Sequence, residues 1–312
     1  MKRLTCCPSN WLIAATILFV STTACHQISP PEATAVLVTN KNSIDPFKEY
    51  WYSGEAELNT YELEQMRYGE MRTGKAVLLY VTEDFSKSKH VKLDNPEKDW
   101  KDKVSVLKLN NLRRFVTGIY DYSMMESVFT PVDLSQYPHT LKTTTTSQDW
   151  CGHTFTQLNF EGGKYRFRQF SYFESEGDED IHVRPDMLED EIWTRLRIQP
   201  EALVTDEIDL LPGTFFIRFN HAKPTPKKAR IRLEQTAQMN RLIIEYLHLN
   251  RSLIIGYEPQ FPYKVLMWEE YDDGQLTSRA QLIQTLKAPY WQLHDNDDLP
   301  LRDSLQLSRA FF

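Results

Sequence analysis

The stretch from Asp149 to Glu176 constrains the fold most strongly, because it predicts two β-strands joined by a glycine turn. Gly162 and Gly163 supply the positive φ angles that a tight hairpin turn needs. The β-branched and aromatic residues on either side suit a pleated, half-buried surface. We therefore predict a hairpin here, followed by an exposed acidic loop over residues 174–180.

The same two-residue period recurs along the chain. Ala229, Ile231 and Leu233 alternate with charged residues, which is typical of an antiparallel sheet with one apolar and one wet face. No helical pattern longer than about three turns stands out. We predict a mainly β protein with one large antiparallel sheet, sandwich-like or half-barrel-like, and few short helices. Further strand-like stretches are 50–58, 76–82, 104–109, 113–132, 139–146, 215–219, 242–249, 252–257, 263–268 and 278–286, while 188–198 fits a strand or a short helix.

The N-terminal segment resembles a secretory signal. Lys2 and Arg3 precede an apolar run of about ten residues, which is shorter than the roughly 20 residues that a permanent membrane helix needs. Residues 22–25 resemble a bacterial lipobox, in which the cysteine, here Cys25, is lipidated and becomes the mature N-terminus. Ordinary cleavage after Ala24 is the alternative.

These features divide the chain into a signal peptide (1–24), a lipidated cysteine with a tether (25–45) and a β-rich domain (46–312). Pro224 and Pro226 suggest a subdomain break near 222–227. His26 and Gln27 follow the lipidated position, and by resemblance to lipoprotein sorting signals we expect an outer-membrane lipoprotein that faces the periplasm.

Charge and cysteine content narrow the function classes. The formal net charge of -7 does not suggest the basic surface that nucleic-acid-binding proteins need. Cys6 and Cys7 lie in the signal peptide and Cys25 would carry lipid, so Cys151 is left without a partner for an intramolecular disulfide. We expect membrane contact through the N-terminal lipid, with a lipid or an envelope protein as partner.

Several segments resemble an uncharacterised lipoprotein family of the Bacteroidota, and the similarity covers nearly all of the mature chain. Members of that family often carry the label septum formation inhibitor Maf. The Maf nucleotide pyrophosphatases are cytoplasmic α/β enzymes with a Ser-x-Ser-Pro-Arg-Arg stretch, which is missing here. The resemblance therefore implies an envelope compartment and a β-rich fold, and no catalytic residue. The segments are 51–58, 61–65, 68–70, 81–85 and 149–153.

One candidate for chemistry is the group Asp149, Cys151 and His153, which would share a face of one strand. Same-face neighbours lie roughly 6.5–7 Å apart, whereas a nucleophile and its base need about 2.6–3.2 Å. Direct pairing of Cys151 with His153 would thus require a bulge, and a buried, inert cysteine is the alternative. The eight histidines are scattered without a metal-binding spacing, so we expect no metal or cofactor.

A second candidate is a ligand-binding surface rich in aromatic and methionine residues. It leads us to expect a cell-envelope lipoprotein that binds an amphiphile or an envelope partner without catalysis. The alternatives are a periplasmic hydrolase that uses the Cys151/His153 region, and a structural envelope protein. The surface would include Met124, Met125, Trp150 and Tyr172, with Phe129, Trp193, Trp268 and Trp291, unless these residues simply form the core.

Overall fold

The structure is a computed structural model that describes residues 45–307. The predicted signal peptide, Cys25 and all of the predicted tether except Asp45 lie outside the described residues. Four hydrophobic clusters fall within the described part, so a chain that begins at residue 26 keeps all of them.

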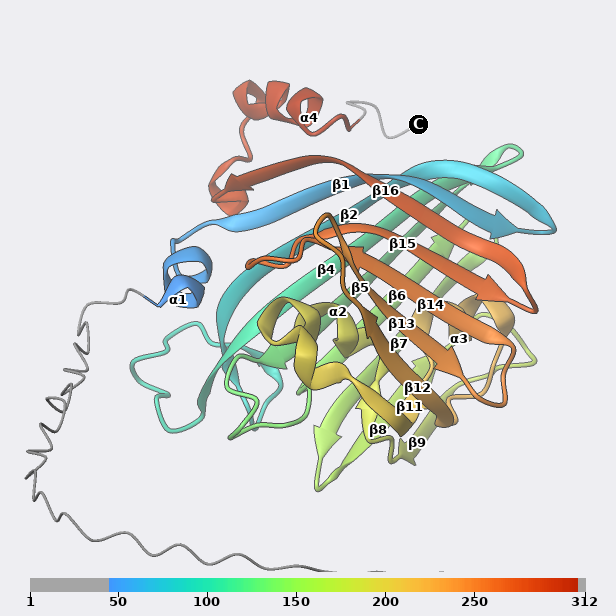
Figure 1. Ribbon diagram of the computed structural model, residues 1–312, viewed down its shortest axis with the longest axis horizontal. Coiled ribbons are helices and arrows are strands. Elements are labelled where there is room, and N and C mark those ends of the chain that lie inside the picture. The colour runs from blue at the N-terminus through green and yellow to red at the C-terminus, as the bar shows by residue number, and fades with distance from the viewer. Residues whose placement is uncertain (1–44, 308–312) are drawn as a thin grey trace, which may run out of the picture. The chain divides into compact units, whose positions relative to one another are not determined.

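One 16-stranded sheet dominates the described domain, which confirms the mainly β prediction (Figure 1). Its strand pairs are antiparallel except for the parallel pair β10–β11. The first strands are β1 (Ala56–Arg67), β2 (Glu70–Ser86), β3 (Val91–Lys92), β4 (Lys103–Thr117), β5 (Tyr120–Pro131), β6 (Lys142–Asp149), β7 (Gly152–Glu161) and β8 (Lys164–Phe170). The others are β9 (Glu179–Val183), β10 (Met187–Leu188), β11 (Thr205–Leu211), β12 (Lys227–Glu234), β13 (Asn240–Tyr246), β14 (Arg251–Tyr257), β15 (Val265–Asp272) and β16 (Gln275–Ala288).

The sheet curves around two short helices, α2 (Glu189–Ile198) and α3 (Thr214–Asn220), which lie in its hollow (Figure 1). Ile192, Trp193 and Leu196 of α2 belong to the main core together with residues from strands on both sides of the curve. Nearly every side chain of α2 is buried, the charged ones included. The charged side chains of a helix that is buried on all sides must find partners inside the protein, because an unpaired buried charge is costly.

The two edges of the sheet meet through side chains without closing by hydrogen bonds. The strand order runs from β10 through β16, then β1, and ends at β9. Tyr165 and Phe167 of β8 share a small cluster with Leu188 of β10 and Leu211 of β11. The sheet is therefore open in its backbone and packed across the seam. The predicted break near 222–227 falls on the link from α3 to β12, and β12 pairs within the same sheet.

The C-terminal segment returns over the outer, convex face. It comprises the 3-10 turns η2 (Tyr290–Gln292) and η3 (Asn296–Asp298) and the helix α4 (Pro300–Ser304). Leu305 is buried against Leu58 and Leu79 of β1 and β2. This segment covers part of the sheet and leaves the neighbouring strands β4 to β8 with an uncovered outer face (Figure 1).

The predicted hairpin is confirmed, and three local predictions were wrong. Gly162 and Gly163 have φ of +57° and +76° and join β7 to β8. Of the predicted strand 50–58, only residues 56–58 belong to a strand, and residues 50 and 51 close helix α1 (Pro46–Trp51). This helix begins where it does because the Asp45 side chain accepts from the Phe47 amide at 3.0 Å and Pro46 suits the first turn.

The segment 215–219 is helical, contrary to the expected strand. Thr214 opens α3, and its amide donates to the buried carboxylate of Asp190 at 2.9 Å. The acidic stretch 174–180 is only partly an exposed loop, since the Glu176 side chain is nearly buried against His221 and Arg218. In both places a distant partner outweighs the local pattern.

A buried ion pair fixes α1 and α2 to the sheet. The Arg197 guanidinium donates two hydrogen bonds of 2.8 Å to the Glu57 carboxylate, and Tyr50 of α1 donates to the same group. Burial alone would raise the pKa of Glu57, but Arg197 and the hydrogen bonds from Tyr50 and Asn59 outweigh it and lower the pKa to about 2.

Candidate functional site

The turn between β6 and β7 holds the three residues predicted as a catalytic group. Strand β6 ends at Asp149 and β7 begins at Gly152, so Cys151 lies in the turn. The Cys151 amide donates to Asp149 Oδ1 at 2.7 Å, an Asx-type contact that closes the turn. The thiol is free and exposed, and so is His153. The turn interrupts the strand face that Asp149, Cys151 and His153 were expected to share.

The four predicted ligand-binding residues are divided between two faces. Met124 is buried on the inner face, whereas its neighbour Met125 points to the outer face, because successive strand residues alternate. Trp150 and Tyr172 are both exposed near the β6–β7 turn. The hollow of the sheet therefore contains only one of the four.

The other predicted aromatic residues do not line one wall. Trp193 and Trp268 pack edge to face in the main core with ring centroids 5.4 Å apart. Phe129 stacks on Phe85 in an outer cluster, and Trp291 is exposed. The hollow is thus filled by core side chains.

Buried charges occupy the interior between α2, α3 and the strands. Glu270 of β15 accepts from Arg113 at 2.9 Å and from Arg251 at 3.3 Å. Arg251 also donates to Glu189 of α2 at 2.7 Å, and Tyr246 donates to Glu189 at 2.5 Å. Hydrogen-bonded pairing of this kind compensates the cost of burying ions.

Glu126 of β5 and Asp190 of α2 form a buried carboxyl pair next to this network. Burial raises the pKa of Asp190 well above its ordinary value, and the facing Glu126 raises it further. Burial also raises the pKa of Glu126. Thr214 binds both partners, with its hydroxyl on Glu126 at 3.0 Å and its amide on Asp190. These raised pKa values favour a protonated carboxyl group between the strand and the helix.

The space left among these charged groups is small. The cavity bordered by Arg113, Asp190 and Glu270 measures about 10 Å³. A single water needs about 10–15 Å³ of such volume. This cavity can hold at most about one water, so we assign the charged groups around it to the architecture of the domain. Among the described residues no cluster of three or more His, Cys, Asp or Glu side chains is arranged to bind a metal ion.

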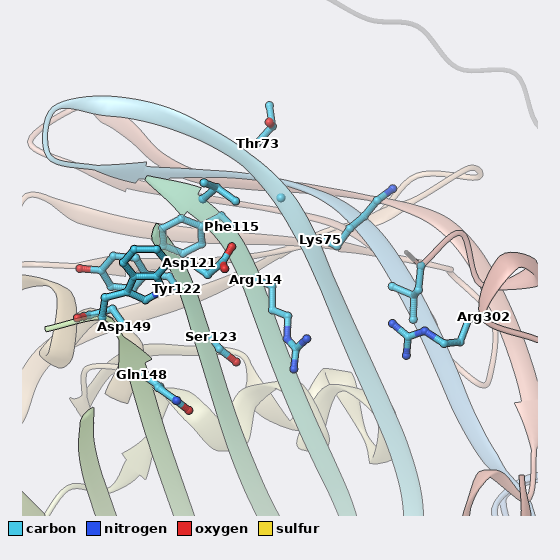
Figure 2. A pocket seen from close by; sticks show the side chains of 14 residues that line it. Thr73, Lys75, Arg114, Phe115, Asp121, Tyr122, Ser123, Gln148, Asp149 and Arg302 are labelled. Atoms are coloured by element: carbon cyan, nitrogen blue, oxygen red, sulfur yellow. The ribbon is translucent and has the colours of Figure 1, made fainter. Parts of the chain in front are cut away.

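A groove of about 510 Å³ lies on the outer face across β2, β4, β5 and β6 (Figure 2). Strand register builds its floor. Lys75 pairs with Arg114, and Arg114 with Ser123. Ser123 in turn pairs with Gln148. These four residues form one cross-strand row, because directly paired residues point to the same face.

Three basic residues from different elements line the groove. Lys75 and Arg114 come from the floor, and Arg302 reaches in from α4 (Figure 2). Lys75 also donates to Glu62 at 2.5 Å. Asp121 and Asp149 lie toward the side opposite Arg302 (Figure 2). A ligand with a negative group would meet complementary charge at the α4 side.

Apolar side chains border the cross-strand row of Lys75, Arg114, Ser123 and Gln148, which we call the basic row. Val116, Trp150 and Leu307 contribute to the walls. The next row along the strands pairs Val77 with Leu112. Leu112 pairs in turn with Met125, and all three residues are partly exposed. A basic row beside an apolar row matches a molecule that has an anionic head and an apolar chain.

Comparison with known proteins does not assign the chain to a family. The chain matches no protein-family model, no curated protein and no solved structure. Function must therefore be inferred from the chemistry of the groove.

Within residues 45–307, none of the helices has the length and apolar character required to traverse a lipid bilayer.

Sequence reasoning singled out Trp150 and Met125 and missed the basic row. Lys75 and Arg114 are 39 positions apart and are brought together by the β2–β4 register alone. The alternation of polar and apolar residues within each strand could be recognised in the sequence. The register between the two strands could not. Arg302 comes from helix α4, which at five residues is too short to show a helical pattern of apolar positions.

Proposed function

We propose that the protein is a cell-envelope lipoprotein whose β domain binds an anionic amphiphile in the outer-face groove without catalysing a reaction on it. The signal-like N-terminus and the lipobox-like residues before Cys25 support the envelope assignment. The resemblance to lipoproteins of the Bacteroidota agrees with it. His26 and Gln27, by resemblance to lipoprotein sorting signals, favour the periplasmic side of the outer membrane.

The observation that carries the binding role is the position of the basic row next to the apolar row. The groove volume falls within the roughly 300–1,000 Å³ typical of small-molecule sites. Lys75, Arg114 and Arg302 can hold a carboxylate or phosphate oxygen. Trp150 in the groove wall supplies an aromatic surface for a chain, and Met125 in the adjoining cross-strand row supplies an adaptable apolar one.

Native mass spectrometry of residues 26–312, purified from a periplasm and then extracted with organic solvent, tests for a resident ligand. We expect a stoichiometric amphiphile with a carboxylate or phosphate head. A clean apo mass, together with failure to bind added oleate or lysophosphatidylglycerol, would contradict the proposal.

Titration of oleate into groove variants locates the site. Replacing both Lys75 and Arg114 with Met should raise the Kd by at least about tenfold, because a charge-assisted hydrogen bond contributes about 1.5–3 kcal/mol. Arg232→Met is the matched control, since Arg232 is an exposed arginine of β12 that pairs with Glu245. Equal loss in the control would show that binding reflects net charge and not the groove.

An envelope hydrolase is the second candidate, and the exposed free thiol of Cys151 beside the groove residue Trp150 favours it. Release of p-nitrophenol from p-nitrophenyl butyrate, compared between the parent chain and Cys151→Ser, decides the point. Hydrolysis by the parent chain that is lost in Cys151→Ser would establish the hydrolase. Absence of hydrolysis by the parent chain would reject the hydrolase and leave ligand binding as the proposed function.

A further inference from the structure

Large apolar side chains stand at successive hairpin turns at one end of the sheet. Tyr68 in the β1–β2 turn is 59% exposed and Ile119 in the β4–β5 turn is 83% exposed. Trp150 in the β6–β7 turn is 66% exposed, and Tyr172 after β8 is 63% exposed. We call these four residues the tip cluster.

Strand register places all of these turns at the same end. The closing pairs of the three tight turns are Arg67 with Glu70, Thr117 with Tyr120, and Asp149 with Gly152. On this side the β2–β4 pairing ends at Gly74 with Phe115, and the β5–β6 pairing ends at Ser123 with Gln148, so the three turns lie beyond the same end of the paired sheet. Figure 1 shows the β1–β2 hairpin extending to the right, at the end opposite α1.

Ring contacts fix the tip cluster in place. The Tyr68 hydroxyl lies 2.8 Å from the Tyr122 hydroxyl. Trp150 contacts Tyr120 with ring centroids 6.3 Å apart. Tyr172 packs directly on Gly152, where an added Cβ would come within 2.8 Å of the Tyr172 ring. Tyr68 and Trp150 are therefore held by residues of the neighbouring strand β5, and Tyr172 is held against the start of β7.

The opposite end of the sheet has a different character. Its β7–β8 turn is Gly162-Gly163, and the segment 94–102 between β3 and β4 is dominated by charged residues. Trp100 in that segment is 66% exposed, and Lys101 lies over its ring at 5.5 Å. Among the described turns, only those at the end of the sheet that carries the tip cluster have several large apolar side chains exposed next to one another. Clustered exposed apolar groups mark an interaction surface.

We propose that the tip cluster docks this end of the domain on a lipid bilayer. Tyrosine and tryptophan favour the level of the lipid headgroups, where an aromatic body and a polar edge are both satisfied. Ile119 enters the acyl boundary. Trp150 belongs to both the tip cluster and the groove wall, so docking brings the groove mouth to the lipid surface. This role rests on the proposed amphiphile binding and names the bilayer as its source.

Charge selects the class of lipid. Asp121, Asp149, Glu174 and Asp178 lie on or next to the tip-bearing turns. Arg67 and Arg72 flank the Tyr68 turn, so this end carries both signs of charge. It has no excess of positive charge that would select an anionic surface, so the bilayer is zwitterionic and docking is driven by apolar burial. Binding should therefore persist at high salt, because screening weakens only electrostatic attraction.

The length of the proposed tether is compatible with this orientation. Cys25 and Asp45 are twenty positions apart, which allows a reach of at most about 70 Å. The longest strand, β2, has 17 residues and spans about 56 Å. A chain anchored at Cys25 can therefore place its far end on the membrane that holds the anchor.

Flotation of residues 26–312 with phosphatidylcholine vesicles tests the docking. The protein should float with the vesicles at both 0.1 M and roughly 1 M salt. Ile119→Asp combined with Trp150→Asp should lower the vesicle-bound fraction by at least about tenfold. Trp100→Asp is the matched control, with the same exposure as Trp150 at the opposite end, and should bind like the parent chain.

Two results would overturn the docking role. One is no flotation with phosphatidylcholine vesicles, and the other is binding restricted to anionic vesicles and abolished by salt. Oleate titration of the same preparations separates the two proposals. Oleate binding without flotation would reject docking and keep the groove, whereas flotation without oleate binding would keep docking and reject the groove.

Discussion

At the scale of single residues, the Glu126–Asp190 pair is the most pH-sensitive feature of the interior. Its two carboxyl groups are buried, with Arg113 near Glu126 and Glu189 near Asp190. The Thr214 hydroxyl donates to Glu126 and the Thr214 amide donates to Asp190. Two neighbouring buried carboxylates cannot both be ionised at low cost, and the raised pKa of Asp190 favours its protonated form.

Asp190→Asn should therefore flatten the dependence of stability on pH. The folded-state pKa of Asp190 lies above its ordinary 3.8, so its stabilising effect is complete below that value and is lost as pH rises toward the raised pKa. The amide keeps a donor toward Glu126 and an acceptor for the Thr214 amide. Urea unfolding at a series of pH values measures the change, with the exposed Asp178→Asn as control. Parallel curves for parent and variant would contradict it.

Gly74 in the groove floor allows a close approach of two strands. An added Cβ would lie 2.1 Å from the Arg114 carbonyl oxygen and 2.8 Å from Phe115 Cβ. Because a strand carbonyl cannot swing aside, Gly74→Ala should cost about 1–3 kcal/mol of unfolding free energy and weaken oleate binding. Thr73→Ala, at the neighbouring exposed position that shares the groove face with Lys75, should change stability by less than about 0.5 kcal/mol. Equal stability of the two variants would refute the close-approach explanation.

At the scale of elements, the Glu57–Arg197 pair joins β1 to α2, and Tyr50 adds α1. Removing one partner leaves the other buried without compensation. Glu57→Gln should lower the unfolding free energy by about 3–5 kcal/mol, as measured by urea denaturation. Glu62→Gln is the control, because Glu62 is exposed and its pair with Lys75 is partly solvated.

The same pair predicts how the parent chain responds to acid. The folded-state pKa of Glu57 is about 2, against an ordinary 4.5. Its contribution is present above 4.5 and is lost as pH falls from there through about 2. Thermal unfolding between pH 6 and pH 2 should show a steeper decline for the parent chain than for Glu57→Gln. An equal slope in both would mean that other carboxylates dominate acid unfolding.

Elements with local causes were predictable, and those with distant causes were not. Gly162-Gly163 fixes its hairpin through its own φ angles. The helix at 214–220 depends on Asp190 and on the absence of a side chain at Gly213, where a Cβ would meet Glu189 Oε1 at 2.6 Å. The Trp150-Cys151 turn carries no glycine at its centre, so it resembled a continuing strand.

At the scale of the whole molecule, the seam between the sheet edges governs cooperativity. Phe167 of β8 is fully buried against residues of β10 and β11. Phe167→Ala should cost about 3–5 kcal/mol and separate the unfolding of β7–β9 from that of the remaining strands. Circular dichroism and tryptophan fluorescence, recorded on one denaturant series, should coincide for the parent chain and diverge for the variant. Coincident curves in the variant would show that the seam does not couple the edges.

The groove illustrates the limit of sequence reasoning at this scale. The alternation of each strand was readable, and it places Lys75, Arg114 and Met125 on a wet face. Which wet faces adjoin depends on the order β2, β4, β5, β6 and on register across roughly 75 positions. Helix α4, which adds Arg302 to the groove, lies in a segment that folds back over the sheet, and no periodic pattern in the sequence predicts that course.

The pairing of β1 with β16 has a consequence for synthesis. Thr285 donates to Asn59 across 226 positions, so the first long strand finds its second neighbour only when the chain is almost complete. Until then one edge of β1 presents unpaired backbone groups, which invite contact with other nascent chains. A protein that crosses a membrane from its N-terminus would expose that edge throughout its passage. Its yield should consequently depend on how fast the last strands arrive and on whatever shields the waiting edge.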